Sequence, residues 1–478
     1  MILRFYYSRP ERQGVSPHTI MRFLDLCEAQ LDSLYSFAVV KGTTIAVEGY
    51  YEPMQPQHLK MTHSVSKSMN ALAVGVAIGD GKLRLDDRMV DFFQDELPER
   101  RDSRIDRITV RDLLMMAASS VATSAAFSNV EGSWRTFYFK SIPYDEPGEY
   151  FSYDTGAAYM LSCIVTKVMG QNSLAVLQER IFGPMGIEGT HWLEDKDGNN
   201  TGGWGFYVKA EDMLKIGRLI LNYGAWEGRQ LIPEWYMREA TAKQIDTFRN
   251  PGTGWGYGYG YQFWRFPENT FGYFGAFGQL LVCSPEKDMY VVTTGGCSRE
   301  ENRRLLTIIT ETFFAESSDK PIPYDDEAYR VMETRLAKLK LPPALGEKLA
   351  QNEEKWFDRD YRGTGQEITE LHFERKNGDT IGVSMKFREE RISFLAGHGN
   401  WITGEGLPLD TPLHTIHSFS YGWVGENHLS IKQYMCNTTY CKVHDILFSQ
   451  SGIEMTVTQN MAIGGERVKH YVFGSDEE

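Results

Sequence analysis

Hydrophobic and polar residues follow two different patterns in two parts of the chain. Up to about residue 315, segments with apolar residues at helical spacing alternate with short strand-like runs. The run Phe37–Tyr51 predicts two strands around Lys41-Gly42, and Val65–Gly79 predicts an apolar helix that Gly81 ends. Further predicted elements are a helix that starts at Ser173, a helix over residues 210–222, and strands over residues 279–283 and 289–293.

The last part of the chain alternates apolar and polar residues with the period of a β-strand. This alternation runs through residues 381–387 and 453–457, and Asn377-Gly378 supplies a hairpin turn. Ahead of this part, the polar, proline-bearing segment Ser317–Tyr324 is typical of a linker, and a helix is predicted over residues 325–339. We therefore expect a large α/β domain over residues 1–318, a linker and helix over 319–351, and an all-β barrel or sandwich over 352–478.

Composition and charge narrow the class of protein. Apolar residues make up 42% and charged residues 24%, as in a folded globular protein. Lys and Arg total 50 against 64 Asp and Glu, and this net charge of -14 disfavours nucleic acid as a partner. No run of about 18 apolar residues predicts a membrane span. The first residues lack the apolar core of a signal peptide, so we expect no export.

The six cysteines form no framework for a metal or redox site, because no CxxC occurs. Cys436 and Cys441 are five residues apart, a spacing more typical of reduced neighbours on paired strands than of a disulfide. Reduced cysteines and the missing export signal together predict a cytoplasmic location.

The best candidate for chemistry is the tetrapeptide Ser-x-x-Lys at Ser64–Lys67. On a helix, residues three apart share a face, so the Ser64 hydroxyl and the Lys67 amine can approach each other. A serine hydroxyl is a poor nucleophile and needs a base beside it. With its usual pKa near 10.4, only about one lysine in a few thousand is neutral at pH 7. Burial or a cationic neighbour must therefore lower the pKa of Lys67, or a second group must share the proton.

The same tetrapeptide occurs twice more, as Ser284–Lys287 in a predicted tight turn and as Ser317–Lys320 in the linker. Nothing packs around a lysine in either place to change its pKa. Only Ser64 starts an apolar helix, whose N-terminus can also help to stabilise an oxyanion. Other signatures of catalysis or nucleotide binding, HExxH, GxSxG and GxGxxG, are absent.

Two further segments are candidates to complete a site around Ser64. Tyr153 lies in a turn before an apolar helical run, where its phenol could stand between a serine and a leaving group; a packing tyrosine is the alternative. The segment Gly275–Gln279 enters a strand, and its small residues could bring a substrate close to backbone N–H groups; a simple turn is the alternative. The glycine-aromatic run Gly252–Trp264 favours strands over a ligand surface.

Together these three elements resemble the serine hydrolases of the β-lactamase and penicillin-binding-protein superfamily, nearest its AmpC-like and esterase branch. The resemblance covers roughly residues 30 to 315 and does not extend to residues 352–478. The stretches that carry it are HSVSKSMNALAVGVAIGDGKLRLDD (63–87), ITVRDLL (108–114), PGEYFSYDTGAAYMLSCIV (147–165), IFGPMGI (181–187), GGWGFYVKAEDMLKIGRLIL (202–221) and FGAFGQLLVCSPEKDMYVV (274–292).

The resemblance implies a β-lactamase/transpeptidase-like α/β fold, with an antiparallel sheet flanked by helices, a helical subdomain, the site between them, and no cofactor or metal. Ser64 would be the acylated nucleophile and Lys67 its proton partner. Tyr153 would be the general base that also protonates the leaving group. The oxyanion would rest on the N–H of Ser64 and on that of Ala276 or Phe277.

The chain departs from the family pattern at two places. Thr155 stands where the family's Tyr-x-Asn has its asparagine, so a hydroxyl instead of an amide would meet the substrate. Phe274-Gly275-Ala276 stands where the family has a Lys or His that would bind a substrate carboxylate. The missing cation argues against efficient β-lactam hydrolysis and against D-Ala-D-Ala carboxypeptidase activity.

We therefore predict a serine hydrolase that acts through an acyl-enzyme on an ester or small amide. A β-lactamase or penicillin-binding protein is the nearest alternative, and a non-catalytic ligand-binding relative is the alternative of another class. The expected partner is a small-molecule substrate, without nucleic acid or membrane. The β domain is expected to be a structural cap that shields the catalytic domain or joins two copies as a homodimer, more than a part that recognises substrate.

Overall fold

The structure is a computed structural model that describes residues 5–120, 122–128, 130–248, 257–406, 416–461 and 467–475. The chain divides into two compact units. The first contains residues 1–49 and 61–337, and the second contains residues 50–60 and 338–478.

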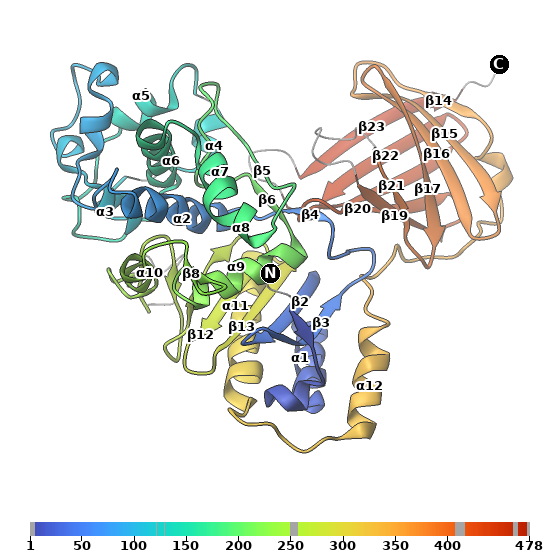
Figure 1. The fold of residues 1–478 in the computed structure, drawn as a ribbon. Coiled ribbons are helices and arrows are strands. Elements are labelled where there is room, and N and C mark those ends of the chain that lie inside the picture. The colour runs from blue at the N-terminus through green and yellow to red at the C-terminus, as the bar shows by residue number, and fades with distance from the viewer. Residues whose placement is uncertain are drawn as a thin grey trace. The chain divides into compact units, whose positions relative to one another are not determined.

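The first unit is built on a mixed β-sheet (Figure 1). Its central strands are antiparallel neighbours and largely buried: β2 (Leu34–Lys41), β13 (Met289–Gly295) and β12 (Gln279–Ser284). The sheet order is β1-β3-β2-β13-β12-β10-β9, with β11 also paired to β12. The short β1 runs parallel to β3, which adds one parallel pair to the expected antiparallel sheet. The outer strands are β1 (Tyr6–Tyr7), β3 (Thr44–Tyr50), β9 (Trp264–Arg265), β10 (Phe271–Gly272) and β11 (Phe274–Gly275).

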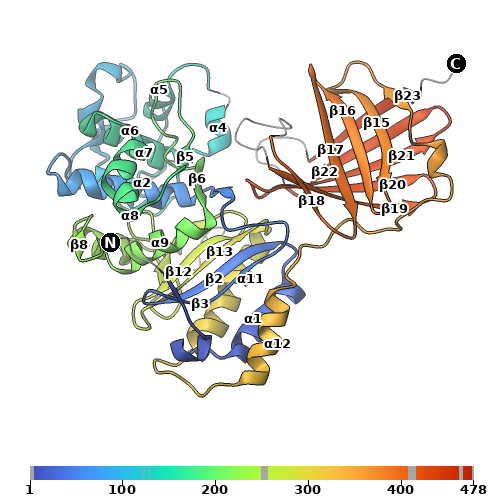
Figure 2. The same ribbon diagram turned by 45° about the vertical axis from the view of Figure 1, so that its right-hand side comes forward.

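Helices cover both faces of this sheet (Figure 2). On one face α9 (Ala210–Leu221) packs closely at Gly217, where a Cβ would stand 2.7 Å from the Tyr290 ring. On the other face α1 (Pro17–Gln30) places Phe23 against Phe37 of β2, with ring centroids 4.8 Å apart. α11 (Arg299–Ile309) and α12 (Asp326–Leu336) pack on α1. The predicted arrangement, a sheet flanked by helices on both faces, is therefore confirmed.

The helical subdomain is centred on α2 (Val65–Gly79) and α6 (Thr155–Met169). α2 has the predicted bounds and is buried over residues 65–77, as its apolar sequence requires. α6 begins after Asp154, whose side chain caps the N–H of Gly156, and ends at Gly170 with φ 75°. The predicted helix at Ser173 is α7 (Ser173–Leu177), which passes through a π-helical turn (Gln178–Phe182) into α8 (Gly183–Met185). The remaining elements are α3 (Val110–Leu114), α4 (Ser124–Ser128), α5 (Trp134–Phe139), α7 (Ser173–Leu177), α8 (Gly183–Met185), α10 (Glu234–Thr241), β4 (Leu59–Met61), β5 (His191–Trp192), β6 (Phe206–Lys209), β7 (Ala225–Trp226) and β8 (Arg229–Gln230).

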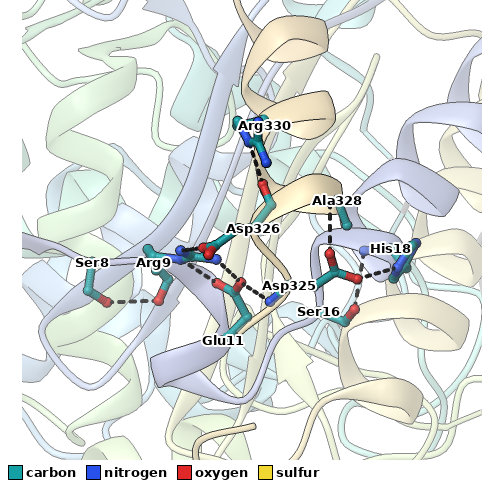
Figure 3. Close-up of polar contacts among 9 residues, drawn as sticks. All are labelled: Ser8, Arg9, Glu11, Ser16, His18, Asp325, Asp326, Ala328 and Arg330. Carbon is teal, nitrogen blue, oxygen red and sulfur yellow. Dashed lines mark hydrogen bonds and ion pairs between the residues drawn. The ribbon is translucent and has the colours of Figure 1, made fainter. Parts of the chain in front are cut away.

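The helix expected in the linker is α12, which belongs to the first unit. Near its start, Asp326 binds Arg9 of the N-terminal segment, and Arg9 also pairs with Glu11 at 2.6 Å (Figure 3). In its last turn Arg335 pairs with Asp25 of α1 at 2.6 Å. Because of these contacts the first unit extends to residue 337, whereas the polar linker predicted a boundary at residue 318.

The second unit is a closed β-barrel (Figure 2). Over its described residues the strand order is β17-β16-β15-β14-β23-β22-β21-β20-β19-β18, and a parallel pairing of β17 with β19 closes it. Of the barrel and the sandwich, the structure therefore has the barrel, and the predicted hairpin turn at Asn377-Gly378 joins β15 to β16. The strands are β14 (Asp360–Arg362), β15 (Ile368–Asn377), β16 (Thr380–Phe387), β17 (Glu390–His398), β18 (Ile402–Gly404), β19 (His417–Gly425), β20 (His428–Met435), β21 (Cys441–Ser449), β22 (Gly452–Gln459) and β23 (Val468–Ser475).

The expectations about membrane spans and cysteines can be compared with the described residues. They contain no single helix that is long and apolar enough to cross a membrane, although the bent pair Thr155–Met169 and Ser173–Met185 passes that test together. All six cysteines are buried and free. Cys436 and Cys441 thus form no disulfide, as predicted.

Candidate active site

Ser64 stands at the N-terminus of α2, where strand β6 bonds to the backbone of Thr62 before it and to the side chain of Ser66 after it. The N–H of Thr62 donates to the carbonyl of Phe206 at 3.0 Å, and the N–H of Phe206 donates to Ser66 Oγ at 3.1 Å. Ser66 Oγ in turn donates to the carbonyl of His63 at 2.6 Å. The Ser64 side chain caps no N–H of α2, so its hydroxyl is left for other contacts.

Lys67 lies one helical turn further along α2 and points at Ser64. Its Nζ donates to Ser64 Oγ at 3.2 Å and to the carbonyl oxygen of Gly203 at 2.8 Å. The lysine is only 2% exposed, and burial lowers the pKa of Lys67 to about 7, against a smaller opposing effect of the Asp154 charge. About half of the Lys67 amines are then neutral at pH 7, so burial supplies the neutral base that the Ser64 hydroxyl needs.

Tyr153 is the third side chain beside Ser64. Its ring centroid lies 4.8 Å from Lys67 Nζ, and the ring stacks on Trp264 with centroids 5.7 Å apart and planes 25° apart. Burial raises the pKa of Tyr153 to about 12, and a hydrogen bond with the Ser64 side chain partly opposes this rise. The phenol therefore carries its proton at neutral pH and can donate it.

The two residues after Tyr153 begin α6 and have different surroundings. Asp154 is buried and accepts hydrogen bonds from the Tyr138 hydroxyl at 2.9 Å and from the N–H of Ala122 at 3.0 Å. Asp154 therefore anchors the turn that carries Tyr153. Thr155 packs on Gly203, where an added Cβ would stand 2.6 Å from Thr155 Cγ2. Contact of the Thr155 hydroxyl with a substrate stays a prediction.

Gly275, in the third predicted segment, is the point at which β11 approaches the start of α2. A Cβ on Gly275 would lie 2.7 Å from the carbonyl oxygen of Thr62 and 2.9 Å from Val65 Cγ2. On the other side, Asn302 Nδ2 donates to the Gly275 carbonyl at 3.0 Å. The strand can reach the backbone next to Ser64 only because this position lacks a side chain.

The turn after Gly275 contains the two candidate donors to an oxyanion, Ala276 and Phe277. Phe277 has a positive φ of 70°, and its ring packs edge-on against His63 with centroids 4.7 Å apart. Its carbonyl accepts from Gln279 Nε2 at 3.1 Å, which holds the turn in place. The turn therefore lies beside the residue that precedes Ser64, and the roles of the two N–H groups stay predictions.

The structure thus brings the predicted Ser64, Lys67 and Tyr153 into mutual contact and places the third segment next to them. A family model described as Beta-lactamase matches residues 31–300, which is more than half of the chain. The chain belongs to the beta-lactamase family. The match begins just before β2 and ends at the start of α11, so it contains every residue of the candidate site.

Two curated relatives of this beta-lactamase-family protein are hydrolases by name. The 6-aminohexanoate-dimer hydrolase of Paenarthrobacter ureafaciens is 21% identical over an alignment of 226 residues that covers 43% of this chain and 57% of the relative. The D-aminopeptidase of Brucella anthropi is 28% identical over an alignment of 141 residues that covers 28% of this chain and 26% of the relative. The chain therefore spans less than two thirds of either relative.

A solved structure extends the likeness in fold to both units. The octameric penicillin-binding protein homologue from Pyrococcus abyssi matches 95% of this chain and 99% of its own, with a TM-score of 0.51 at 15% identity. At this identity the likeness shows the fold alone. The family's sheet, its helical subdomain and a C-terminal barrel therefore occur together in another chain.

Three contributors to the site of this beta-lactamase-family protein were not predicted as such. They are the Gly203 carbonyl that accepts from Lys67, the Trp264 ring under Tyr153, and Asp154 as an anchor. Gly203 lies in one of the family-like stretches, but a backbone acceptor has no signature in sequence. Trp264 ends the glycine-aromatic run, whose residues 252–256 lie outside the described residues.

The close approach at Gly275 predicts the effect of adding one methyl group. Gly275→Ala should lower kcat at least about tenfold and lower Tm by several degrees, because overpacking costs about 1–3 kcal/mol and moves the turn away from Ser64. Gly425→Ala is a matched control, since its Cβ would meet only His428 Cβ at an ordinary 3.5 Å. Steady-state kinetics and thermal denaturation of both variants check this; equal losses in the two would contradict it.

Proposed function

We propose that this protein hydrolyses an ester or small amide through an acyl-enzyme on Ser64. The observation that supports the proposal most is the buried Lys67 amine, hydrogen-bonded to Ser64 Oγ at 3.2 Å with its pKa lowered to about 7. A nucleophilic serine needs a neutral base within hydrogen-bond reach, and few lysines meet both conditions.

In the proposed reaction Ser64 Oγ attacks the substrate carbonyl while its proton passes to Lys67. The oxyanion accepts from the N–H of Ser64 and from that of Ala276 or Phe277. Collapse of the tetrahedral intermediate breaks the bond to the leaving group, which takes a proton from Tyr153. Water then attacks the acyl-enzyme and gives one proton to the Tyr153 phenolate, and Lys67 returns its proton to Ser64 Oγ as the carboxylic acid leaves.

The pKa values favour this division of labour between the two groups. The pKa of Lys67 is lowered to about 7, while that of Tyr153 is raised to about 12, both mainly by burial. At pH 7 about half of Lys67 is a free base, whereas only about one Tyr153 in 10⁵ is a phenolate. We therefore propose Lys67 as the base for acylation and Tyr153 as the proton donor, a narrower role than the general base implied by the family resemblance.

The substrate is proposed to lack an essential carboxylate. The third segment offers Phe274, Gly275 and Ala276 where a cation would pair with such a group. The names of the two relatives, a 6-aminohexanoate-dimer hydrolase and a D-aminopeptidase, support an amide as well as an ester. Cytoplasmic location and dimerisation through the barrel stay predictions.

The pH dependence of kcat/KM follows from Lys67. Below about pH 7 this lysine holds its proton and cannot accept one from Ser64, so kcat/KM should fall about tenfold per pH unit; above pH 7 it should level off. Rates of p-nitrophenyl acetate hydrolysis between pH 5 and 9 measure this acidic limb of the pH profile of kcat/KM. A midpoint near pH 10, the ordinary value for lysine, would contradict the assignment.

A substrate panel tests the function itself. We expect steady hydrolysis of a short-chain p-nitrophenyl ester and of the matching p-nitroanilide, with slower turnover of a chromogenic cephalosporin. A cephalosporin turned over faster than the ester would instead assign a β-lactamase.

A further inference from the structure

Asp154 is a buried acidic residue whose two neighbours in sequence lie beside Lys67 or its acceptor. The side chain is 1% exposed and directly precedes α6. Before it, the Tyr153 ring centroid lies 4.8 Å from Lys67 Nζ. After it, Thr155 packs on Gly203, where an added Cβ would stand 2.6 Å from Thr155 Cγ2 and 3.4 Å from Lys67 Nζ. Asp154 therefore lies where the start of α6 approaches Lys67.

Within the described residues, every hydrogen bond of the Asp154 carboxyl group is donated to it. Oδ1 accepts from the N–H of Ala122 at 3.0 Å and from that of Gly156 at 2.7 Å. Oδ2 accepts from the Tyr138 hydroxyl at 2.9 Å, and the N–H of Ala157 is a further donor. Burial raises the pKa of Asp154, and these hydrogen bonds oppose the rise. Because an ionised carboxylate only accepts, this set of donors favours the charged form at neutral pH.

The other titratable side chains that interact with Lys67 are neutral at pH 7. Burial, and after it the charge of Lys67, lowers the pKa of His63 to about 3. Burial raises the pKa of Tyr153 to about 12. Among the described residues, Asp154 is then the one charged group that acts on Lys67.

We propose that Asp154 is a positioning residue for acylation, whose negative charge offsets the positive charge that Lys67 takes on with the proton of Ser64. This role rests on the proposed function, in which that proton moves from Ser64 Oγ to Lys67 Nζ as Oγ bonds to the substrate carbon. A buried ammonium group is costly, because burial removes the water that would solvate it. A carboxylate already fixed by its donors need not reorient when this charge appears, so it favours the transition state.

Titration of Lys67 in variants of Asp154 tests the proposal directly. In protein labelled with ¹³C at lysine Cε, the NMR signal that is lost in Lys67→Met should titrate near pH 7 in the wild type. Asp154→Asn and Asp154→Ser keep an oxygen to cap the N–H of Gly156 but remove the charge. Each should therefore move the midpoint to lower pH by at least about half a unit. The acidic limb of kcat/KM should move with it, and its plateau should fall at least about threefold.

Two variants control for loss of structure and for loss of charge elsewhere. Tyr138→Phe removes a donor to Asp154 and keeps the carboxylate. Asp195→Asn removes a carboxylate of the same kind from the turn between β5 and β6, where it accepts from the Tyr159 hydroxyl at 2.6 Å and from the N–H of Asn199 at 2.9 Å. Both variants should leave the Lys67 midpoint near pH 7, and circular dichroism establishes that each variant is folded.

The outcomes separate this inference from the proposed function. A Lys67 midpoint that stays at the wild-type value in both Asp154 variants, or that moves as far in Asp195→Asn, overturns the inference and leaves the acyl-enzyme on Ser64 standing. Ester hydrolysis that survives in Ser64→Ala overturns the proposed function, and the NMR midpoints then still decide whether the charge of Asp154 acts on Lys67.

Discussion

Ser64→Ala is expected to lower kcat for ester hydrolysis by about 10⁴-fold or more, while Tm stays within about 2 °C of the wild type. The activity falls because no other group can form the acyl intermediate, and loss of a catalytic serine has effects of this size or larger. Stability is retained because the half-buried Ser64 caps no N–H of α2 and gives up chiefly its bonds with Lys67 and Tyr153. Initial rates and thermal denaturation of purified protein measure both quantities.

The chain offers a matched control for this variant in its other Ser-x-x-Lys sequences. Ser317→Ala removes a buried hydroxyl that has no hydrogen-bond partner among the described residues, so both activity and stability should be kept. Wild-type turnover by Ser64→Ala, or an equal loss in Ser317→Ala, would contradict the proposed nucleophile.

Lys67→Met is expected to lower kcat/KM by about 10³-fold without loss of stability at pH 7. Methionine keeps the length of the side chain but cannot accept the Ser64 proton, and positioned bases contribute about 10²–10⁴-fold. Since the folded-state pKa of about 7 lies below the unfolded value near 10.4, the unfolded chain binds the extra proton between these pH values. The wild type therefore loses stability as pH falls through this window, and the variant does not, so Tm of the variant should equal or exceed that of the wild type.

Lys287→Met serves as the control for Lys67→Met, because Lys287 belongs to the turn and donates only to the Ser317 carbonyl among its described hydrogen bonds, at 3.0 Å. The pH profile adds a readout that a purely structural role would not move: the limb near pH 7 should vanish in Lys67→Met. Near-wild-type activity with an unchanged limb would contradict the assignment of Lys67 as the base.

The parts of the site that sequence predicts well are local ones. Ser64 and Lys67 lie three residues apart on one helix, so helical geometry alone brings them together. A lowered pKa of Lys67 was one of the conditions under which it could act as a base, but its cause, burial against Gly203 and under Tyr153, depends on tertiary packing. Tyr153 and Gly275 were candidates from their own segments, but their roles beside Ser64 came from the family resemblance, because no local rule pairs segments this far apart.

The parts that sequence reasoning missed involve backbone atoms or packing partners. The Gly203 carbonyl and the Trp264 ring contribute contacts that any residue with the right backbone or any aromatic ring could make. The first unit extends to residue 337, because the ion pair of Arg335 with α1 returns the chain to this unit after the polar, proline-bearing segment, a long-range contact that has no signature in sequence.

In the barrel, too, the sequence predicts the local elements but not the pairing of distant strands. Alternation predicted its strands and the turn at Asn377-Gly378, since both are local patterns. Closure depends on the pairing of Gly397 with Ser420 and of His398 with Tyr421, strand neighbours whose contact the pattern does not specify.

The most direct test of the central proposal is intact-mass spectrometry after brief exposure to p-nitrophenyl acetate, with Ser64→Ala in parallel. The proposed mechanism predicts a single acetyl increment on the wild-type chain, its loss over time as water completes turnover, and none on the variant. Folded wild-type protein that hydrolyses the ester without ever showing the increment, or an increment retained by Ser64→Ala, would contradict an acyl-enzyme on Ser64.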